Sequence, residues 1–278
     1  MASHEFTSIR SPRIKGVRRL AKRTFRQRER RFLVEGPQAV REALAAGESS
    51  PAAANSPVVL ELYATAEAMQ RHIELVDAAR AAGVPTHRVS LDVMSELAQT
   101  VTPQGVIAVC GFVDVPLEQV GNVRLAAVLS HVRDPGNAGT VLRTADAAGA
   151  DVVIFTDASV DPYNGKCVRA SAGSLFHLPV VVGVTAADAV AFLRDVGVRV
   201  WAADGGGTKN LHEAADSSQL DGPVGWVFGN EAWGLPDDVV RLTDGAVSVP
   251  IYGGAESLNL ATAAAVCLYT TARQQRRL

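Results

Sequence analysis

The second half of the chain contains six short apolar runs, each bounded by turn residues and separated by segments with a helical period. The runs are continuously apolar rather than alternating, which is typical of parallel strands that are covered on both faces. The strands predicted in this way span residues 125–130, 152–156, 180–184, 198–203, 224–228 and 247–249. A long helix is expected after them, from about Ser257 to Arg273. This order predicts a doubly wound α/β domain with a ligand site at the carboxyl ends of its strands.

The first half alternates helical and strand patterns as well. Ile14, Val17, Leu20 and Ala21 recur at the helical period and predict a basic helix over residues 12–23. The other helices are expected at residues 37–46, 66–82 and 91–98, and the strands at residues 32–34, 58–63, 87–89 and 106–112. The Ser-, Ala- and Pro-rich residues 47–57 are expected to form a loop. This half therefore predicts a compact α/β sandwich.

The domain organisation follows from a break between the two series. Residues 114–122, which include Pro116 and Gly121, have the composition of a linker. We expect a first domain over residues 1–113 and a second over residues 123–278, since 278 residues suffice for two domains.

Composition excludes several classes of protein. The longest apolar runs, such as residues 179–184, are far shorter than a membrane span, and no apolar stretch follows the charged N-terminus. Cys110, Cys167 and Cys267 are odd in number and dispersed, without the spacing of a zinc site. We expect a cytoplasmic protein with reduced thiols and no metal.

Charge is distributed unevenly. Residues 1–31 contain eleven Lys and Arg against two Glu, whereas the remainder has sixteen basic and twenty-seven acidic residues. A basic segment on an acidic body indicates nucleic-acid binding. The alternatives are a solvated basic helix and a segment that pairs with the acidic body. The candidate RNA contacts in this segment are Arg18, Arg19, Lys22 and Arg23.

Three predicted strands end in polar and glycine-rich loops rather than in plain helix caps. The loops span residues 134–143, 228–234 and 249–260. Neither the Gly-x-Gly-x-x-Gly fingerprint nor a P-loop is present, so ordinary dinucleotide or triphosphate binding is disfavoured. Gly205–Gly207 is interpreted as a flexible turn. Since all three loops follow strands, they predict one composite site.

Each polar residue of these loops also has a purely structural interpretation. In this interpretation Asn137 serves merely to cap a helix that begins near Ala138, and Ser257 caps the last helix. Glu231 would merely lie near the start of the next helix, where the helix dipole favours a negative charge. Arg143 could be a surface charge, but it stands in a small, apolar helix, where a buried charge needs a partner. Asn259 has no local reason to lie inside a helix, which favours a functional role.

A further segment places Lys166 and Arg169 one helical turn apart, where they could hold a phosphate or remain solvated charges. Cys167 is interpreted as a packing residue, and His131 and His177 as structural.

Together the three loops resemble the signature motifs of the SpoU (TrmH-like) RNA ribose 2'-O-methyltransferases, and the resemblance covers residues 123–278. More loosely, Phe32–Gly36 and the alternation of the first half resemble the family's L30e-like substrate-binding domain. The resemblance implies a trefoil-knotted α/β domain, a homodimer and S-adenosylmethionine as the methyl donor. It assigns catalysis to Asn137, Arg143, Glu231, Ser257 and Asn259. The implied cofactor contacts are Phe228, Gly229, Asn230, Val249, Ile251, Leu258 and Leu260.

The activity implied by the resemblance is methylation of an RNA ribose 2'-hydroxyl, with 23S ribosomal RNA as the expected substrate. The alternatives are a tRNA ribose methyltransferase and a non-catalytic RNA-binding or ribosome-assembly factor. A nicotinamide oxidoreductase lacks its phosphate fingerprint and is set aside.

Overall fold

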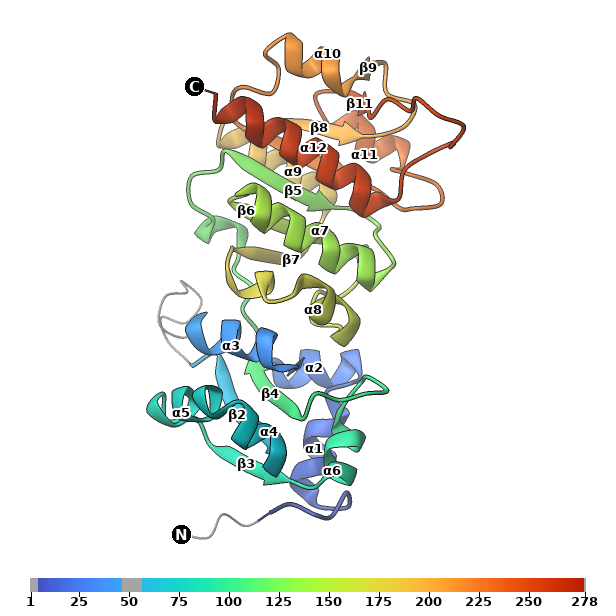
Figure 1. Cartoon of the computed structure of the whole chain (residues 1–278). Helices are drawn as coiled ribbons and strands as arrows, with labels where there is room; N and C mark the ends of the chain where they lie inside the picture. The colour runs from blue at the N-terminus through green and yellow to red at the C-terminus, as the bar shows by residue number, and fades with distance from the viewer. Residues whose placement is uncertain (1–4, 47–56, 278) are drawn as a thin grey trace. The chain divides into compact units, whose positions relative to one another are not determined.

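The structure is a computed structural model that describes residues 5–46 and 57–277 (Figure 1). It contains two compact units. Unit 1 comprises the described residues up to Val113 together with Tyr163–His177, and unit 2 comprises Asp114–Pro162 and the described residues from Leu178 onward. The chain thus enters unit 2, returns to unit 1 for one short segment, and re-enters unit 2. Apart from Pro57, the loop expected at residues 47–57 lies outside the described residues.

Unit 1 is built on a four-stranded sheet of order β1-β4-β2-β3. Strand β4 is antiparallel to both β1 and β2, whereas β2 and β3 are parallel. The strands are β1 (Arg31–Glu35), β2 (Val59–Thr65), β3 (Thr86–Val89) and β4 (Val106–Gly111). The helices are α1 (Pro12–Arg19), α2 (Arg23–Glu29), α3 (Pro37–Ala46), α4 (Ala66–Arg71), α5 (Ile73–Ala81), α6 (Leu91–Leu97) and α8 (Gly165–Ser171), with a short 3-10 turn, η3 (Ser174–Phe176).

Two helix predictions in unit 1 were wrong in extent. The helix expected over residues 12–23 ends at Arg19, and α2 begins at Arg23. The single helix expected over residues 66–82 is two helices, because His72 leaves the helical region with φ −121° and ψ 49°. Thr65 caps α4 by accepting a hydrogen bond from the Ala68 N–H. The chain leaves α5 through Gly83, whose φ of +70° favours glycine.

Helix α1 is part of the core of unit 1 and not a free basic arm. Ile14, Val17 and Leu20 are buried in one cluster with residues of β2, β4 and α6. Ala21, expected on the same face, is exposed because α1 ends at Arg19. The basic segment therefore contributes apolar contacts to unit 1 in addition to charge.

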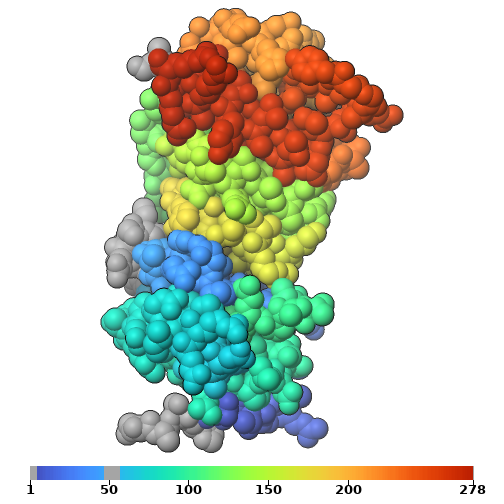
Figure 2. Space-filling view, viewed as in Figure 1, coloured from blue at the N-terminus to red at the C-terminus, as the bar shows by residue number. Residues whose placement is uncertain are grey.

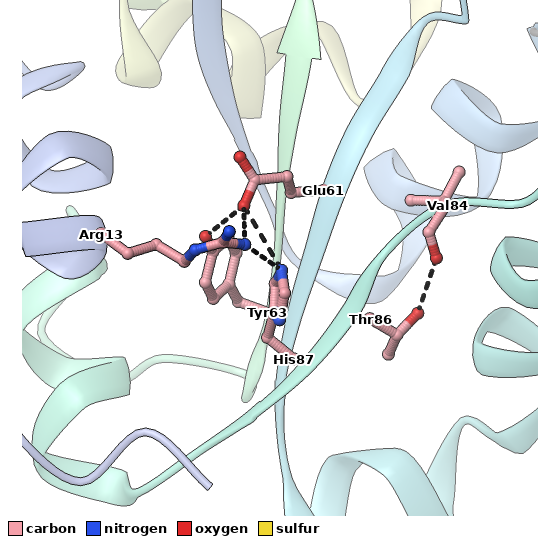
Figure 3. Close-up of polar contacts among 6 residues, drawn as sticks. All are labelled: Arg13, Glu61, Tyr63, Val84, Thr86 and His87. Atoms are coloured by element: carbon pink, nitrogen blue, oxygen red, sulfur yellow. Dashed lines mark hydrogen bonds and ion pairs between the residues drawn. The ribbon is translucent and has the colours of Figure 1, made fainter. Parts of the chain in front are cut away.

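A polar cluster fastens the outer face of α1 to the sheet (Figure 3). The Arg13 guanidinium donates to Glu61 Oε2 at 3.0 Å and lies 2.6 Å from His87 Nε2. Tyr63 donates its hydroxyl proton to the same Glu61 oxygen at 2.5 Å. A guanidinium can only donate, so His87 Nε2 accepts and the imidazole is neutral. Burial, reinforced by Arg13, holds the pKa of His87 below its usual value.

Unit 2 is a seven-stranded, wholly parallel sheet of order β7-β6-β5-β10-β8-β11-β9. Its strands are β5 (Leu125–Leu129), β6 (Val152–Thr156), β7 (Val180–Val184), β8 (Arg199–Ala203), β9 (Lys209–Asn210), β10 (Val224–Phe228) and β11 (Ala246–Ser248). Its helices are α7 (Pro135–Ala148), α9 (Ala186–Asp195), α10 (Leu211–Asp216), α11 (Asp237–Leu242) and α12 (Leu260–Gln275), with a 3-10 turn, η2 (Leu117–Gln119).

The sheet of unit 2 is covered on both faces, as its continuously apolar strands predicted. Helices α7 and α12 pack together against β5 and β10 on one face, while α9 and α11 contact each other on the opposite face (Figure 1). Every residue of β5, β6 and β10 is buried. This double cover leaves the carboxyl ends of the strands, with the loops that follow them, as the place for a ligand.

Candidate functional site

The three polar loops follow β5, β10 and β11. Strand β10 pairs with β5 on one side and with β8 on the other, and β8 pairs with β11. Because all of these strands are parallel, their carboxyl ends lie along one edge of the sheet. The three loops therefore start from the same edge of the sheet, and hydrogen bonds join them to one another.

In the first loop, the predicted cap was wrong. Asp134, not Asn137, caps α7, and its side chain accepts from the Asn137 N–H at 2.9 Å. Pro135 occupies the first helical turn, where its missing N–H costs nothing. Asn137 is therefore already inside the helix, and its side-chain amide is left for partners outside it.

The second loop is a tight turn that returns on itself. Asn230 and Gly234 exchange backbone hydrogen bonds of 2.8 and 2.9 Å, and the Asn230 side chain accepts from the Ala232 N–H. At Gly229 an added Cβ would lie 2.5 Å from the backbone of Gly234, so only glycine permits this approach. The turn carries Glu231 at its tip, with its side chain exposed.

In the third loop, the last helix begins later than expected. Its cap is Asn259, whose side chain accepts from the N–H groups of Ala261 and Thr262, and not Ser257. The sequence argument that Asn259 lacks a local reason was therefore wrong. Residues 251–259 are exposed throughout, and this red-orange part of the chain projects at the surface of unit 2 (Figure 2).

Two side-chain hydrogen bonds join the three loops. Asn137 Nδ2 donates to Glu231 Oε1 at 2.9 Å, and Asn259 Nδ2 donates to Asn137 Oδ1 at 3.1 Å. Asn137 is thus the central member, with its donor used on one side and its acceptor on the other. Because Asn259 uses its oxygen for α12 and its nitrogen for Asn137, one amide fixes both the helix and the loop connection. We call this connection the Glu231–Asn137–Asn259 relay.

A cavity of about 320 Å³ opens beside the second and third loops. Of the residues expected to contact a cofactor, only Phe228 does not line it, since Phe228 is buried at the end of β10. Those that do line it are Gly229, Asn230, Val249, Ile251, Leu258 and Leu260. The catalytic candidates Glu231 and Ser257 line it as well.

The sequence reasoning missed the contribution of β8. Asp204 and Gly205, which follow β8 directly, also line the cavity, as does Glu256. The turn expected at residues 205–207 is present, with the Gly206 and Gly207 N–H groups donating to Asp204. The sequence could have predicted this contribution, because β8 is followed by Asp-Gly-Gly-Gly, a polar and glycine-rich loop like the three recognised ones.

The charge of the cavity selects the kind of cofactor. Asp204, Glu231 and Glu256 line it, whereas the described lining residues include no Lys or Arg. Carboxylates favour a ligand with positive charge and disfavour a polyphosphate. An apolar wall of Val249, Leu258 and neighbouring residues suits a flat heterocycle. A ligand that combines an aromatic base with cationic groups fits this lining, and S-adenosylmethionine is such a molecule.

Arg143 is exposed on α7, and the described part of the chain gives it no hydrogen bond or ion pair. The argument that it needs a partner to offset burial was therefore wrong, because the side chain is not buried. An unpaired cation two turns after Asn137, on the helix that carries the relay, is free to meet an anionic group of a substrate.

The candidate RNA contacts differ in how free they are. All four basic residues named in the N-terminal segment are exposed, but Arg18 pairs with Glu96 and Arg19 lies over the Phe25 ring, 5.5 Å from its centroid. For Lys22 and Arg23 no such contact occurs among the described residues.

The two cations of α8 in unit 1, Lys166 and Arg169, differ in exposure. Lys166 is exposed, whereas Arg169 Nη1 lies 3.3 Å from Glu35 Oε2. Glu35 also accepts from the Gln99 N–H and from the Thr100 hydroxyl. Arg169 therefore has a structural partner in Glu35, and Lys166 is the more exposed of the two cations.

The described residues hold no group of side chains suited to a metal ion, and no helix among them is long and apolar enough to cross a membrane. All three cysteines are buried, and none forms a disulfide with another described residue. Burial raises the pKa of the Cys267 thiol to about 12 and that of Cys110 further still. The Cys110 and Cys267 thiols are therefore packing groups and not nucleophiles at neutral pH.

Comparison with known proteins agrees with this geometry. The SpoU rRNA Methylase family matches residues 124–269, and the MRM3-like substrate binding domain matches residues 11–108. A Bacillus subtilis relative, the 23S rRNA (guanosine(2553)-2'-O)-methyltransferase RlmP, is 33% identical over 95% of this chain and 98% of its own.

Two solved structures have the same architecture. The AdoMet-bound rRNA methyltransferase from Sinorhizobium meliloti is 30% identical, with a TM-score of 0.83 and 97% of each chain covered. AviRb from Streptomyces viridochromogenes, in complex with AdoMet, is 28% identical, with a TM-score of 0.80 over 96% of this chain and 100% of its own. The chain belongs to the SpoU rRNA methylase family.

Proposed function

We propose that this protein transfers the methyl group of S-adenosylmethionine to a ribose 2'-hydroxyl of ribosomal RNA, with 23S rRNA as the substrate. The observation that carries the proposal is the Glu231–Asn137–Asn259 relay, which joins three loops beside an acidic and apolar cavity. The activity printed for the Bacillus subtilis relative and the AdoMet-bound neighbour support it.

The cavity would hold the cofactor through its backbone and its carboxylates. The Gly229 backbone would allow close approach, Val249, Ile251 and Leu258 would pack against the adenine, and Asp204 or Glu256 would face the cationic groups. The bound cofactor supplies an electrophilic methyl group on a sulfonium. The chain must then place a ribose oxygen in line with that methyl group.

A ribose hydroxyl is a weak nucleophile, so the site must stabilise negative charge that develops on its oxygen. Arg143 is the group for this task, since its guanidinium is exposed and unpaired in the described structure and stays charged at neutral pH. Glu231, Asn137 and Asn259 would orient the ribose, and Ser257, which lines the cavity, would contact substrate or cofactor.

RNA selection would belong to unit 1, whose residues 11–108 match a substrate-binding domain. We assign this role to residues 1–113, with residues 114–122 as the linker and residues 123–278 as the methyl-transfer domain. Lys22, Arg23 and Lys166 are exposed cations that would contact phosphates. Such contacts give affinity, whereas the choice of RNA depends on a folded or unpaired target.

The family resemblance extends the proposal to the assembly. We infer a trefoil knot in unit 2, a homodimer, and action in the cytoplasm, where ribosomal RNA is modified. Residues 261–268 of α12 are apolar enough for a dimer contact, but Ala264, Cys267 and Leu268 are already buried within the chain. A dimer contact of α12 would therefore use its other side, which carries the exposed Tyr269.

The test offers the protein methyl-labelled S-adenosylmethionine with unmodified 23S rRNA, 16S rRNA and tRNA, followed by nucleoside analysis. We expect label in a 2'-O-methyl nucleoside of 23S rRNA. Label in tRNA alone would favour tRNA ribose methylation. Cofactor binding without label on any RNA, naked or within a ribosomal particle, would leave a non-catalytic RNA-binding factor and overturn the proposal.

The role of Arg143 has its own test. We expect Arg143→Ala to lower kcat by on the order of 10³-fold, as for the loss of one group that stabilises transition-state charge. The dissociation constant for S-adenosylmethionine, measured by calorimetry, should stay unchanged because Arg143 does not line the cavity. Arg143→Lys, which keeps the charge without the planar fork, should recover part of the rate. Wild-type turnover by Arg143→Ala would exclude this role.

A further inference from the structure

Trp233 stands out among the tryptophans of unit 2. Its side chain is 53% exposed, whereas Trp201 and Trp226 are 3% and 0% exposed. Single exposed apolar residues are common on protein surfaces and need no explanation. An exposed indole in a loop of the candidate site is more informative, because it can contact a ligand there. Trp233 lies in the turn of the second loop, two residues after Glu231.

The turn fixes where the indole lies. The backbone bonds between Asn230 and Gly234 close the turn around Glu231, Ala232 and Trp233. Gly234 continues it with a φ of +73°, and Gly229 lies against its backbone. Ala232 and Gly234 line the cofactor cavity, but Trp233 between them does not. The indole is thus held beside the cavity without being part of its wall.

A strained residue between β5 and the first loop supports the indole. His131 follows β5 with a φ of +61°, a left-handed conformation that is uncommon for a residue with a side chain. Its imidazole meets Trp233 edge to face, with ring centroids 5.5 Å apart and planes at 70°. The Ser130 hydroxyl lies 2.9 Å from His131 Nδ1, and Asn230 Nδ2 donates to the His131 carbonyl at 3.2 Å.

The same turn therefore contacts the first loop through Glu231 at Asn137, and the segment between β5 and that loop through Trp233 at His131. Arg133 and Arg143 add two exposed cations to the first loop and its helix, and neither has an ion pair among the described residues. Proteins hold single-stranded RNA by this combination, in which cations contact the phosphates and bases stack on an exposed aromatic ring.

We propose that Trp233 is a stacking platform for an unpaired nucleobase of the RNA, next to the ribose that is methylated. The inference rests on the proposed function and adds a substrate-positioning residue to it. Stacking on the indole would hold the ribose at the relay without altering cofactor binding. Because every nucleobase has a flat face, the platform fixes position rather than sequence.

The first experiment follows RNA affinity. Trp233→Ala should weaken binding of the RNA substrate by roughly 5- to 150-fold, the range for loss of one base stack. Trp233→Phe, which keeps an aromatic face, should restore most of the affinity. Val196→Ala, which removes another exposed apolar side chain of unit 2, should have no effect. Affinity for S-adenosylmethionine should be unchanged in all three variants, which also reports that unit 2 is folded.

The second experiment uses the indole as its own reporter. Trp201 and Trp226 are buried, so quenching of tryptophan emission on addition of RNA should come from Trp233 and be absent in Trp233→Phe. Wild-type RNA affinity in Trp233→Ala, with methylation by the wild-type protein intact, would overturn the platform and leave the proposed function standing. Emission that changes with protein concentration without RNA would also overturn it, since a second copy would then cover the ring. Absence of RNA binding by the wild-type protein would overturn both proposals.

Discussion

At the scale of the residue, two asparagines connect the loops of the site, and one of them also caps a helix. Capping was the structural alternative for Asn137, but Asp134 caps α7 and Asn137 links two loops, whereas Asn259 caps α12. The residue types in the loops identified the site, but capping depends on where a helix begins, and helix starts are uncertain from sequence alone. The loop identities could be predicted, and the connection through Asn137 could not.

The two tasks of Asn259 can be separated by substitution. Asn259→Asp keeps an oxygen that caps α12 but loses the N–H donated to Asn137, so stability should stay near wild type while kcat falls by on the order of 10²-fold. Asn259→Ala loses both contacts and should also cost about 1 kcal/mol of unfolding free energy. Chemical denaturation and single-turnover methylation measure the two effects. Equal rates in Asn259→Asp and wild type would remove the relay from the mechanism.

At the scale of the element, α1 shows how a charge count alone can mislead. Residues 1–31 read as a basic arm, yet Ile14, Val17 and Leu20 lie in the core of unit 1. The helical period of the apolar residues predicted this buried face, while the charge described only the opposite one. Deleting the segment would therefore open the core as well as remove cations, and point substitutions are the cleaner test of RNA binding.

The free cations of the segment should report on phosphate contacts. We expect Lys22→Ala with Arg23→Ala to weaken RNA binding and to reduce the slope of log K against log salt by about 1.4 to 1.8. Arg18→Ala is the control, since Arg18 is already paired with Glu96. Filter binding at several salt concentrations gives the slopes. An unchanged slope in the double variant would mean that this face does not meet the RNA backbone.

The cluster around Arg13 should make unit 1 sensitive to acid. The folded pKa of His87 lies below its unfolded value of 6.5, so the unfolded chain takes up the proton first as pH falls. The His87 contribution to unfolding free energy is therefore full above pH 6.5 and is lost as pH falls through the folded pKa. His87→Gln should flatten the fall measured by denaturation between pH 7 and pH 5. A slope identical to wild type would assign the acid sensitivity to other groups.

At the scale of the whole molecule, the strands were predicted well and the composition of the units was not. Continuous apolar runs located β6, β7 and β10 at their observed bounds. Strands β6 and β10 are buried throughout, which leaves an unambiguous pattern, whereas the edge strand β7 is buried only in its first two residues. The two-residue strand β9 is too short to show such an apolar pattern in the sequence. The inclusion of Tyr163–His177 in unit 1 depends on contacts with Phe32 and Glu35, far away in sequence.

That segment should be required for a stable unit 1. Phe32 is buried with its ring centroid 4.7 Å from that of Tyr163, and Tyr163 stacks on Phe112 at 3.8 Å. A fragment of residues 1–113 lacks Tyr163, Phe176 and the partner of Glu35, so it should melt well below the full chain and bind a hydrophobic dye. Calorimetry and dye fluorescence measure this. A fragment with the same midpoint as unit 1 in the full chain would show that the segment is dispensable.

The return of the chain to unit 1 also sets an order of events during synthesis. A domain that is continuous in sequence can fold as soon as its last residue leaves the ribosome, but unit 1 must wait until Tyr163–His177 has been made. At usual elongation rates the delay is several seconds, on the order of the time needed to translate β5, α7 and β6. Throughout that interval Phe32 and Phe112 await their aromatic partner, and the nascent chain offers chaperones an apolar surface that the finished protein does not have.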